Sequence, residues 1–328
     1  MELIQKRIEE SSAMIEQIAD NIENVIIGKR DKIELVILAM LCGGNVLIED
    51  VPGVGKTSLV SALAKSVSCD FSRIQFTPDV MPSDVTGFSI FNQKTREFEF
   101  RPGSVMSNII LADEINRASA KTQSSLLEAM EEKQVTVDSV TYKLEEPFMV
   151  LATENPLESY GTYPLPEAQI DRFMIKLSLG YAEFNEEVKI ISMSRDKKEA
   201  LQPVASKEEI IALREAAENV FVSPMVSEYI VRIVTATRNN SDIAIGSSPR
   251  GGISLYQLSR AYALSKGRSY VIPDDIKYLV PYALVHRVAL THDAKVRKKT
   301  AEDVLSEILS SVAVPIAGEE KFKQNENK

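Results

Sequence analysis

The 328-residue sequence contains no tryptophan, two cysteines and two histidines. Cys42 and Cys69 are far apart and stand in helix-like surroundings, so we expect small buried side chains rather than a disulfide. His286 and His292 have no cysteine or histidine partner at ligand spacing, which argues against a protein-bound zinc ion. This cysteine usage fits a reducing compartment.

The chain also lacks a long apolar run. Its most apolar stretch, residues 35–42, ends at Gly43-Gly44-Asn45, well short of the roughly 20 residues that a membrane span needs. The opening MELIQKRIEE is polar and helical in pattern, unlike the leader of a secreted protein. We therefore expect a cytoplasmic protein that does not insert into a membrane.

Basic residues are in deficit, with 38 Lys and Arg against 47 Asp and Glu, which gives a formal net charge of -9. This balance argues against broad, non-specific binding to nucleic acid. A local basic cluster does occur at Lys295, Arg297, Lys298 and Lys299. Such a cluster is more typical of a solvated helix face than of a nucleic-acid contact.

The most informative pattern that is present spans residues 47–59, LIEDVPGVGKTSL. An apolar strand, expected over residues 45–49, runs into a glycine-containing loop, and a helix is expected from residue 58. The backbone N–H groups of such a loop, with the positive end of the helix dipole, hold the phosphates of a nucleotide. Lys56 adds a point charge and Thr57 a ligand for Mg²⁺. The residues that we expect to bind the nucleotide here are Gly53, Val54, Gly55, Lys56, Thr57 and Ser58.

One position departs from the full pattern G-x-x-x-x-G-K-[ST], because Asp50 stands where the first glycine is expected. A carboxylate near the phosphates weakens nucleotide binding by like-charge repulsion, unless it turns away or binds a cation. A scaffold that binds nucleotide with negligible turnover therefore stays open as an alternative to an ATPase.

Two later strands carry polar residues at their ends. The apolar run 109–112 ends in Asp113 and Glu114, and we expect it to form a partner strand that ends beside the phosphate loop. Asp113 is suited to hold Mg²⁺, and Glu114 to polarise the water that attacks the γ-phosphate. The strand ending at Thr153 is followed by Asn155, whose amide can position that water; a plain Asn-Pro turn is the alternative.

Strands and helices alternate through the first 180 residues, which predicts an α/β fold with a parallel five-stranded sheet flanked by helices. The expected strands are residues 45–49, 72–76, 108–112, 148–153 and 174–177. Two β-hairpins are expected as inserts, within residues 77–104 and 134–143. Beyond residue 184 the patterns are helical. We therefore expect a nucleotide-binding domain at 1–180, which begins with a helix, a smaller all-α lid domain at 184–316 and a disordered tail at 317–328.

Taken in order, the motifs VPGVGKT, ADEINRA, LATENP, GTYPLPEAQIDRF and SPR resemble the MoxR family of AAA+ ATPases over residues from about 26 to about 286. The resemblance implies ATP and Mg²⁺ as cofactors and a homo-oligomeric ring, most often a hexamer. In that family's terms Asn155 looks like the sensor 1 residue, Arg172 like the arginine finger and Arg250 like the sensor 2 arginine of the lid. Ile27 and Gly28 look like the segment that contacts adenine.

The resemblance also implies how the site is shared between subunits. We expect Arg172 to reach the nucleotide of a neighbouring subunit, with Arg117 as a rival for this role. Arg250 opens a lid helix that we expect to fold over the nucleotide of its own chain, like the other site residues, which act in cis. The two hairpins look like the helix 2 insert and the hairpin before sensor 1.

The family is implied to act on proteins, as chaperones that remodel, mature or activate client complexes, including the insertion of metal cofactors. Its partners often carry von Willebrand factor A domains, so a client of that kind is expected here. A nucleic-acid-dependent motor is the second alternative, because related inserts occur in helicase and chelatase subunits. The acidic net charge speaks against that alternative.

Overall fold

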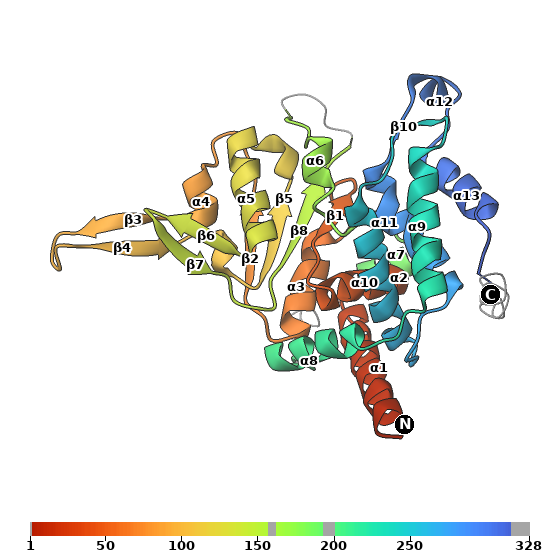
Figure 1. Cartoon of the computed structure of the whole chain (residues 1–328). Helices are drawn as coiled ribbons and strands as arrows, with labels where there is room; N and C mark the ends of the chain where they lie inside the picture. The colour runs from red at the N-terminus through yellow and green to blue at the C-terminus, as the bar shows by residue number, and fades with distance from the viewer. Residues whose placement is uncertain (1, 157–161, 193–200, 316–328) are drawn as a thin grey trace, which may run out of the picture.

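The computed structural model describes residues 2–156, 162–192 and 201–315. Figure 1 shows an α/β part that carries two projecting hairpins, and a helical part that is built mainly from the C-terminal third of the chain. The tail expected at 317–328 and a short stretch of the expected all-α domain, residues 193–200, lie outside the described residues. None of the described helices is both long and apolar enough to cross a membrane.

A parallel sheet of five strands forms the centre of the described α/β part, in the order β2-β5-β8-β1-β9. Its strands are β1 (Val46–Glu49), β2 (Phe71–Gln75), β5 (Ile109–Asp113), β8 (Met149–Glu154) and β9 (Ile175–Leu177). The predicted α/β fold is confirmed. In this order β8 lies between β1 and β5, the strand that ends in the acidic pair.

Helices cover both faces of this sheet. Because side chains of a strand alternate between its faces, neighbouring residues of one strand pack into different cores. Val46 and Ile48 face the core formed with α1 (Glu2–Glu23), α2 (Arg30–Leu41) and α3 (Lys56–Ser66). Leu47 faces the second core, with α5 (Ala120–Glu132). The remaining short helices of this part are α4 (Pro82–Thr86), η1 (Ser104–Met106), η2 (Ile115–Arg117) and α6 (Glu167–Ile170).

Both expected hairpins are present. The first pairs β3 (Gly87–Asn92) with β4 (Glu97–Pro102), and the second pairs β6 (Gln134–Val137) with β7 (Val140–Lys143). The rings of Phe100 and Tyr142 stack with their centroids 4.0 Å apart, so the hairpins support each other at their bases. Phe91 and Phe98 pair farther along the first hairpin and are at least half exposed.

The helical part contains α7 (Phe184–Ser192), α8 (Lys207–Glu218), α9 (Pro224–Arg238), α10 (Pro249–Ser265), α11 (Pro273–Leu284), η4 (Val285–Arg287), α12 (His292–Val296) and α13 (Ala301–Ser311). Serine or threonine side chains cap the first turns of α8, α9, α10 and α13. Two short antiparallel strands, β10 (Ile243–Ile245) and β11 (Ala289–Leu290), were not expected from the sequence.

The two parts share one apolar core. Ile18 of α1, Leu63 of α3 and Leu258 of α10 are fully buried in the same cluster, and α1 packs against α10 as well as α2 and α3. Ser12 of α1 also donates its hydroxyl hydrogen to the carbonyl of Ser265, 2.9 Å away, at the end of α10. This packing fixes where α10, and with it Arg250, lies relative to the sheet.

Candidate functional site

The phosphate loop is shaped by glycines in the left-handed backbone region. Gly53 has φ +89° and Gly55 has φ +96°, which side chains on Cβ disfavour. Gly55 is the residue before the first turn of α3, so this helix begins at Lys56 rather than at residue 58 as expected. The backbone N–H groups at the start of α3 consequently have no earlier turn to bond to and are available to an anion.

Lys56 is directed back into this loop. Its side chain is largely buried, and Nζ donates to the backbone carbonyls of Asp50 at 2.8 Å and Val51 at 3.4 Å. Thr57 and Ser58 are partly exposed on the first turn of α3. A cation and hydroxyl groups therefore lie at the helix N-terminus, as a nucleotide phosphate requires.

The carboxylate of Asp50 points away from the loop. Its Oδ1 accepts a hydrogen bond from the N–H of Val51 at 2.9 Å, and its Oδ2 accepts from the N–H groups of Leu179 at 2.7 Å and Gly180 at 2.8 Å. The hydroxyl of Ser178 donates to Oδ2 at 3.1 Å. The negative charge thus lies among donors at the exit of β9, which removes the like-charge objection raised by the sequence.

Asp113 is held by two groups that the sequence did not indicate. Its Oδ1 accepts from the hydroxyl of Thr153 at 2.7 Å, and its Oδ2 accepts from Nη2 of Arg73 at 2.6 Å. The N–H of Glu114 donates to the same Thr153 hydroxyl at 2.9 Å. Thr153 therefore fixes the acidic pair from the strand that separates β5 from β1.

Glu114 follows the end of β5 in a left-handed conformation, with φ +56°. Its Oε2 accepts from Nε2 of Gln75 at 2.9 Å and forms an ion pair with Nε of Arg117 at 3.0 Å. Gln75, the last residue of β2, was also missed in the sequence, because its position opposite Asp113 follows from the pairing of β2 with β5. Arg117, the rival candidate for the arginine finger, thus pairs with Glu114 of its own chain.

The strand pairing places Asn155 at the edge of the sheet where the phosphate loop begins. It directly follows β8, whose Glu154 pairs in register with Glu49 of β1, and it is buried. The N–H of Asp50 donates to the carbonyl of Glu154 at 3.1 Å. Burial, followed by the proximity of Glu49, raises the pKa of the Glu154 carboxyl. Asn155 and the acidic pair thus share the edge of the sheet where the phosphate loop lies.

The oxygen donors at this edge fit Mg²⁺, which prefers carboxylate and hydroxyl ligands and keeps several water and phosphate oxygens. Asp113 and Thr57 supply one group of each kind. No cluster of three or more His, Cys, Asp or Glu side chains in the described ranges could hold a metal by itself. A magnesium ion that arrives with nucleotide phosphates needs no such cluster.

The segment expected at adenine, Ile27 and Gly28, has a contact with the helical part. Val25, two residues before Ile27, lines a hollow of about 230 Å³ together with Thr57 and Ser58. Gly28, at φ +73°, lies against the carboxylate of Glu186 in α7, so that a side chain on Gly28 would collide with it. Ile27 is partly exposed between these two contacts.

Arg172 and Arg250 meet elsewhere, on the carboxylate of Glu131 at the end of α5. Nη2 of Arg172 lies 3.2 Å from Oε2 of Glu131, and Nη1 donates to the carbonyl of Leu127 at 3.0 Å. Nη2 of Arg250 donates to Oε1 of the same Glu131. Two guanidinium groups from different parts of the fold thus share one carboxylate.

This arginine pair lies at the opposite edge of the sheet from the phosphate loop. Both arginines line a hollow with Gly44 and Asn45, which precede β1, whereas the loop follows β1. The N–H of Met174 donates to the carbonyl of Asn45 at 2.8 Å, which places Arg172, two residues earlier in the chain, near the start of β1. At about 3.3 Å per residue, Asn45 and Asp50 are separated by roughly 16 Å.

In this structure Arg250 therefore does not lie over the phosphate loop of its own chain. The reason is the packing of α10: the hydroxyl of Ser248, which caps this helix, donates to Asp171 at 2.8 Å. Arg287 holds the same carboxylate, with Nε 2.9 Å from Oδ1. These contacts fix the start of α10 beside Arg172.

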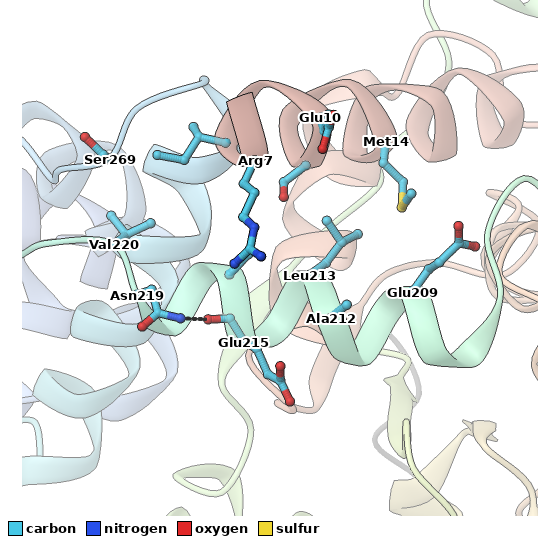
Figure 2. A pocket seen from close by; sticks show the side chains of 13 residues that line it. Arg7, Glu10, Met14, Glu209, Ala212, Leu213, Glu215, Asn219, Val220 and Ser269 are labelled. Carbon is cyan, nitrogen blue, oxygen red and sulfur yellow. Dashed lines mark hydrogen bonds between the residues drawn. The ribbon is translucent and has the colours of Figure 1, made fainter. Parts of the chain in front are cut away.

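A larger hollow of about 720 Å³ lies between α1 and α8. Figure 2 shows Arg7 and Met14 extending from α1 toward α8, where Leu213 faces them. Its lining holds neither the glycine loop nor the acidic pair. The size of a cavity therefore does not locate the site in this molecule.

The chain matches two family models. One, described as "ATPase family associated with various cellular activities (AAA)", covers residues 45–175, and the other, an AAA lid domain, covers residues 235–308. The first range contains the phosphate loop and the acidic pair, and the second contains α10, α11 and α12 of the helical part. The fold and the site together define an ATPase of the AAA+ class.

Relatives narrow this class to a family. The sequence is 53% identical to YeaC of Bacillus subtilis, across 94% of this chain and 97% of that protein. It is 41% identical to Chaperone MoxR1 of Mycobacterium tuberculosis, across 92% of this chain and 82% of that protein. A crystal structure of a candidate ATPase from Cytophaga hutchinsonii superposes with a TM-score of 0.88, at 38% identity over 95% of this chain and 98% of that one. The chain belongs to the MoxR family of AAA+ ATPases.

Proposed function

We propose that this protein is a Mg²⁺-dependent ATPase that hydrolyses ATP in a ring of identical copies, most simply a hexamer, and uses the cycle to remodel client proteins. The observation that carries the proposal is the separation of its charged groups. Lys56, Asp113 and Glu114 gather at one edge of the sheet, and Arg172 and Arg250 at the other. A complete site therefore needs two copies.

Each group at the phosphate edge has a role in this reaction. Lys56 and the N–H groups of residues 53–58 bind the β- and γ-phosphates, and Glu114 orients and polarises the attacking water with Asn155. Thr57 and Asp113 would hold Mg²⁺, which when bound neutralises charge on the phosphate oxygens. Gln75 and Arg117 keep the carboxylate of Glu114 in place through their contacts with Oε2.

The arginine pair would act on the neighbouring copy. A guanidinium group stays charged and grips phosphate oxygens in pairs, and a finger of this kind is worth about 10³ to 10⁵ in kcat. Arg172 and Arg250 are partly exposed, so they can exchange Glu131 for a γ-phosphate of the adjoining subunit. Heterologous contacts of this type form a ring when the rotation between successive copies closes.

The client is proposed to be a protein complex, as the name of the chaperone relative from Mycobacterium tuberculosis suggests. A partner with a von Willebrand factor A domain and a role in metal-cofactor insertion are the specific forms of this proposal. The basic cluster does not favour nucleic acid, because Arg297 and Lys299 form ion pairs with Asp242, and Lys299 also with Glu307. The cytoplasm is the proposed compartment.

The test of the ATPase proposal is phosphate release from ATP with Mg²⁺ or EDTA, at protein concentrations that span ring assembly. Native protein is expected to turn over only with Mg²⁺, and more per subunit as concentration rises. Glu114→Gln should lower kcat by about 100-fold or more, whereas Glu132→Gln, at an exposed helix end, should leave it unchanged. Full turnover by Glu114→Gln would overturn the assignment.

The client proposal is tested by affinity capture with Glu114→Gln, which should bind ATP without hydrolysing it. Captured chains would be identified by mass spectrometry in ATP and in ADP, after nuclease treatment. ATP-dependent capture of the same protein partner in repeated experiments supports the chaperone. Capture that nuclease abolishes would instead support a nucleic-acid motor.

A further inference from the structure

Asp50 occupies a site that is shaped for a carboxylate. Leu179 and Gly180 donate consecutive backbone N–H groups to its Oδ2, and Gly180 has φ +63°. A side chain on Gly180 would meet nothing within 4 Å, so this glycine serves the turn of the backbone rather than a close contact. Successive N–H groups in such a turn form a nest that binds anions. The segment after β9 is therefore folded around the charge of Asp50.

The backbone of the same residue belongs to the phosphate loop. The carbonyl of Asp50 accepts a hydrogen bond from Nζ of Lys56 at 2.8 Å, and its N–H donates to the carbonyl of Glu154 at 3.1 Å. One buried residue thus contacts the lysine of the nucleotide site through its backbone and the segment 178–180 through its side chain.

That segment leads into the helical part. It continues to Tyr181, whose carbonyl accepts a hydrogen bond from Nζ of Lys29 at 2.8 Å, and then to α7, where Glu186 lies against Gly28. The segment 178–180 is therefore placed between the phosphate loop on one side and the start of the helical part on the other.

We propose that Asp50 is a positioning residue that couples the phosphate loop to the segment 178–180 and so to α7. This inference rests on the proposed function, because ATP bound at Lys56 is the signal. When Lys56 turns its donors to phosphate oxygens, the carbonyl of Asp50 loses a partner, and the backbone there can shift. The carboxylate then carries the shift to the N–H groups of Leu179 and Gly180. Such coupling is reciprocal, so the segment also alters nucleotide affinity.

Amide hydrogen exchange of the peptide covering residues 176–186 tests the proposal, measured by mass spectrometry without nucleotide, with ATP and Mg²⁺, and with ADP. In native protein, ATP should change the exchange rates of the Leu179 and Gly180 amides by about fivefold or more. In Asp50→Asn, whose side-chain amide cannot replace the charge in the nest, the ATP-induced change should disappear while the protein still binds ATP.

Ser178→Ala is the matched control. It removes the hydroxyl that donates to Oδ2 but keeps the carboxylate and both backbone donors, so the ATP-induced change should persist. Gly180→Ala keeps Asp50 and strains the nest, and should reduce the change if Asp50→Asn does not fold. For both variants the measured quantity is the difference in exchange between the nucleotide-free and the ATP-bound protein. A purely structural role of Asp50 would not alter this difference.

The outcomes separate this inference from the proposed function. Failure of native protein to bind ATP overturns both. ATP binding with unchanged exchange at residues 178–180 in native protein overturns the coupling alone, whatever the variants do. An equal ATP-induced change in native protein and in folded Asp50→Asn also overturns it.

Discussion

Arg287→Ala should destabilise the protein far more than an ordinary surface substitution. The side chain of Arg287 is 2% exposed, and its guanidinium group joins η4 to the segment before β9. Nε lies 2.9 Å from Oδ1 of Asp171, and other N–H groups donate to the carbonyls of Phe173 at 2.7 Å and Met174 at 3.0 Å. Alanine removes the donor of each of these hydrogen bonds.

The magnitude follows from this environment. Removing one partner of a buried ion pair costs about 3 to 5 kcal/mol, since the other charge and its hydrogen-bonding groups stay buried. Asp171 keeps the hydroxyl of Ser248 as a donor, which places the expected loss toward the lower end of that range. Arg287→Lys should recover part of it, because an ammonium group offers at most three donors in place of the planar fork.

Thermal unfolding followed by calorimetry measures this effect. We expect Arg287→Ala to lower the midpoint by about 5 to 10 °C, and Arg232→Ala, an exposed arginine on α9, by less than about 1 °C. Asp171→Asn combined with Arg287→Ala should cost less than the sum of the single changes, because the two residues are in contact. A midpoint for Arg287→Ala within 1 °C of native, as expected only of the control, would refute the reasoning.

Two further predictions concern pH. Burial, and then Arg287, holds the pKa of His286 well below its usual range, so the unfolded state takes up a proton below about pH 6.5 that the native state does not. The free energy of unfolding should therefore fall on acidification from pH 7 to 5. His286→Gln should flatten this fall, whereas His292→Gln, on the exposed α12, should not. Equal dependence of the unfolding free energy on pH in both variants, measured by chemical denaturation, would contradict the account. Burial lowers the pKa of Lys133 to about 8, with Arg214 contributing. Between pH 8 and about 10.5 the native ammonium has lost its proton while that of the unfolded chain keeps it, so the free energy of unfolding should rise with pH in this range. Lys133→Met should remove that rise, and an unchanged denaturation profile across this range would contradict the prediction.

Local signals were sufficient for much of the fold. Each sheet strand lies within one residue of its predicted bounds, because short apolar runs between turns report burial directly. The phosphate loop could be located because its glycines and the following Lys56 and Thr57 form a local pattern between a strand and a helix; Gly53 and Gly55 do take positive φ. Alternation of apolar residues likewise located both hairpins.

The strand order and several contacts of the site depend on long-range packing, which local sequence patterns do not reveal. The position of β8 between β1 and β5 is a choice of strand order, and no residue within these strands encodes it locally. The location of Arg250 depends on how α10 packs against α1 and on the contact between Ser248 and Asp171. Contacts such as those of Thr153 and Arg73 with Asp113 depend on sheet register, which becomes visible only once the strands are paired.

The roles of the site residues in catalysis stay predictions, and their division between two copies is the central claim. Mixing two inactive variants tests it most directly. Arg172→Ala retains Glu114 but should lose the finger, and Glu114→Gln retains Arg172 but should lose the activating carboxylate.

In a ring mixed from equal amounts of the two variants, about a quarter of the sites combine an intact Glu114 with an intact Arg172 from the neighbour. We therefore predict that phosphate release by the mixture recovers toward a quarter of the native rate, while each variant alone stays inactive. A mixture that releases no more phosphate than its separate components, under conditions in which both variants assemble, would contradict the account.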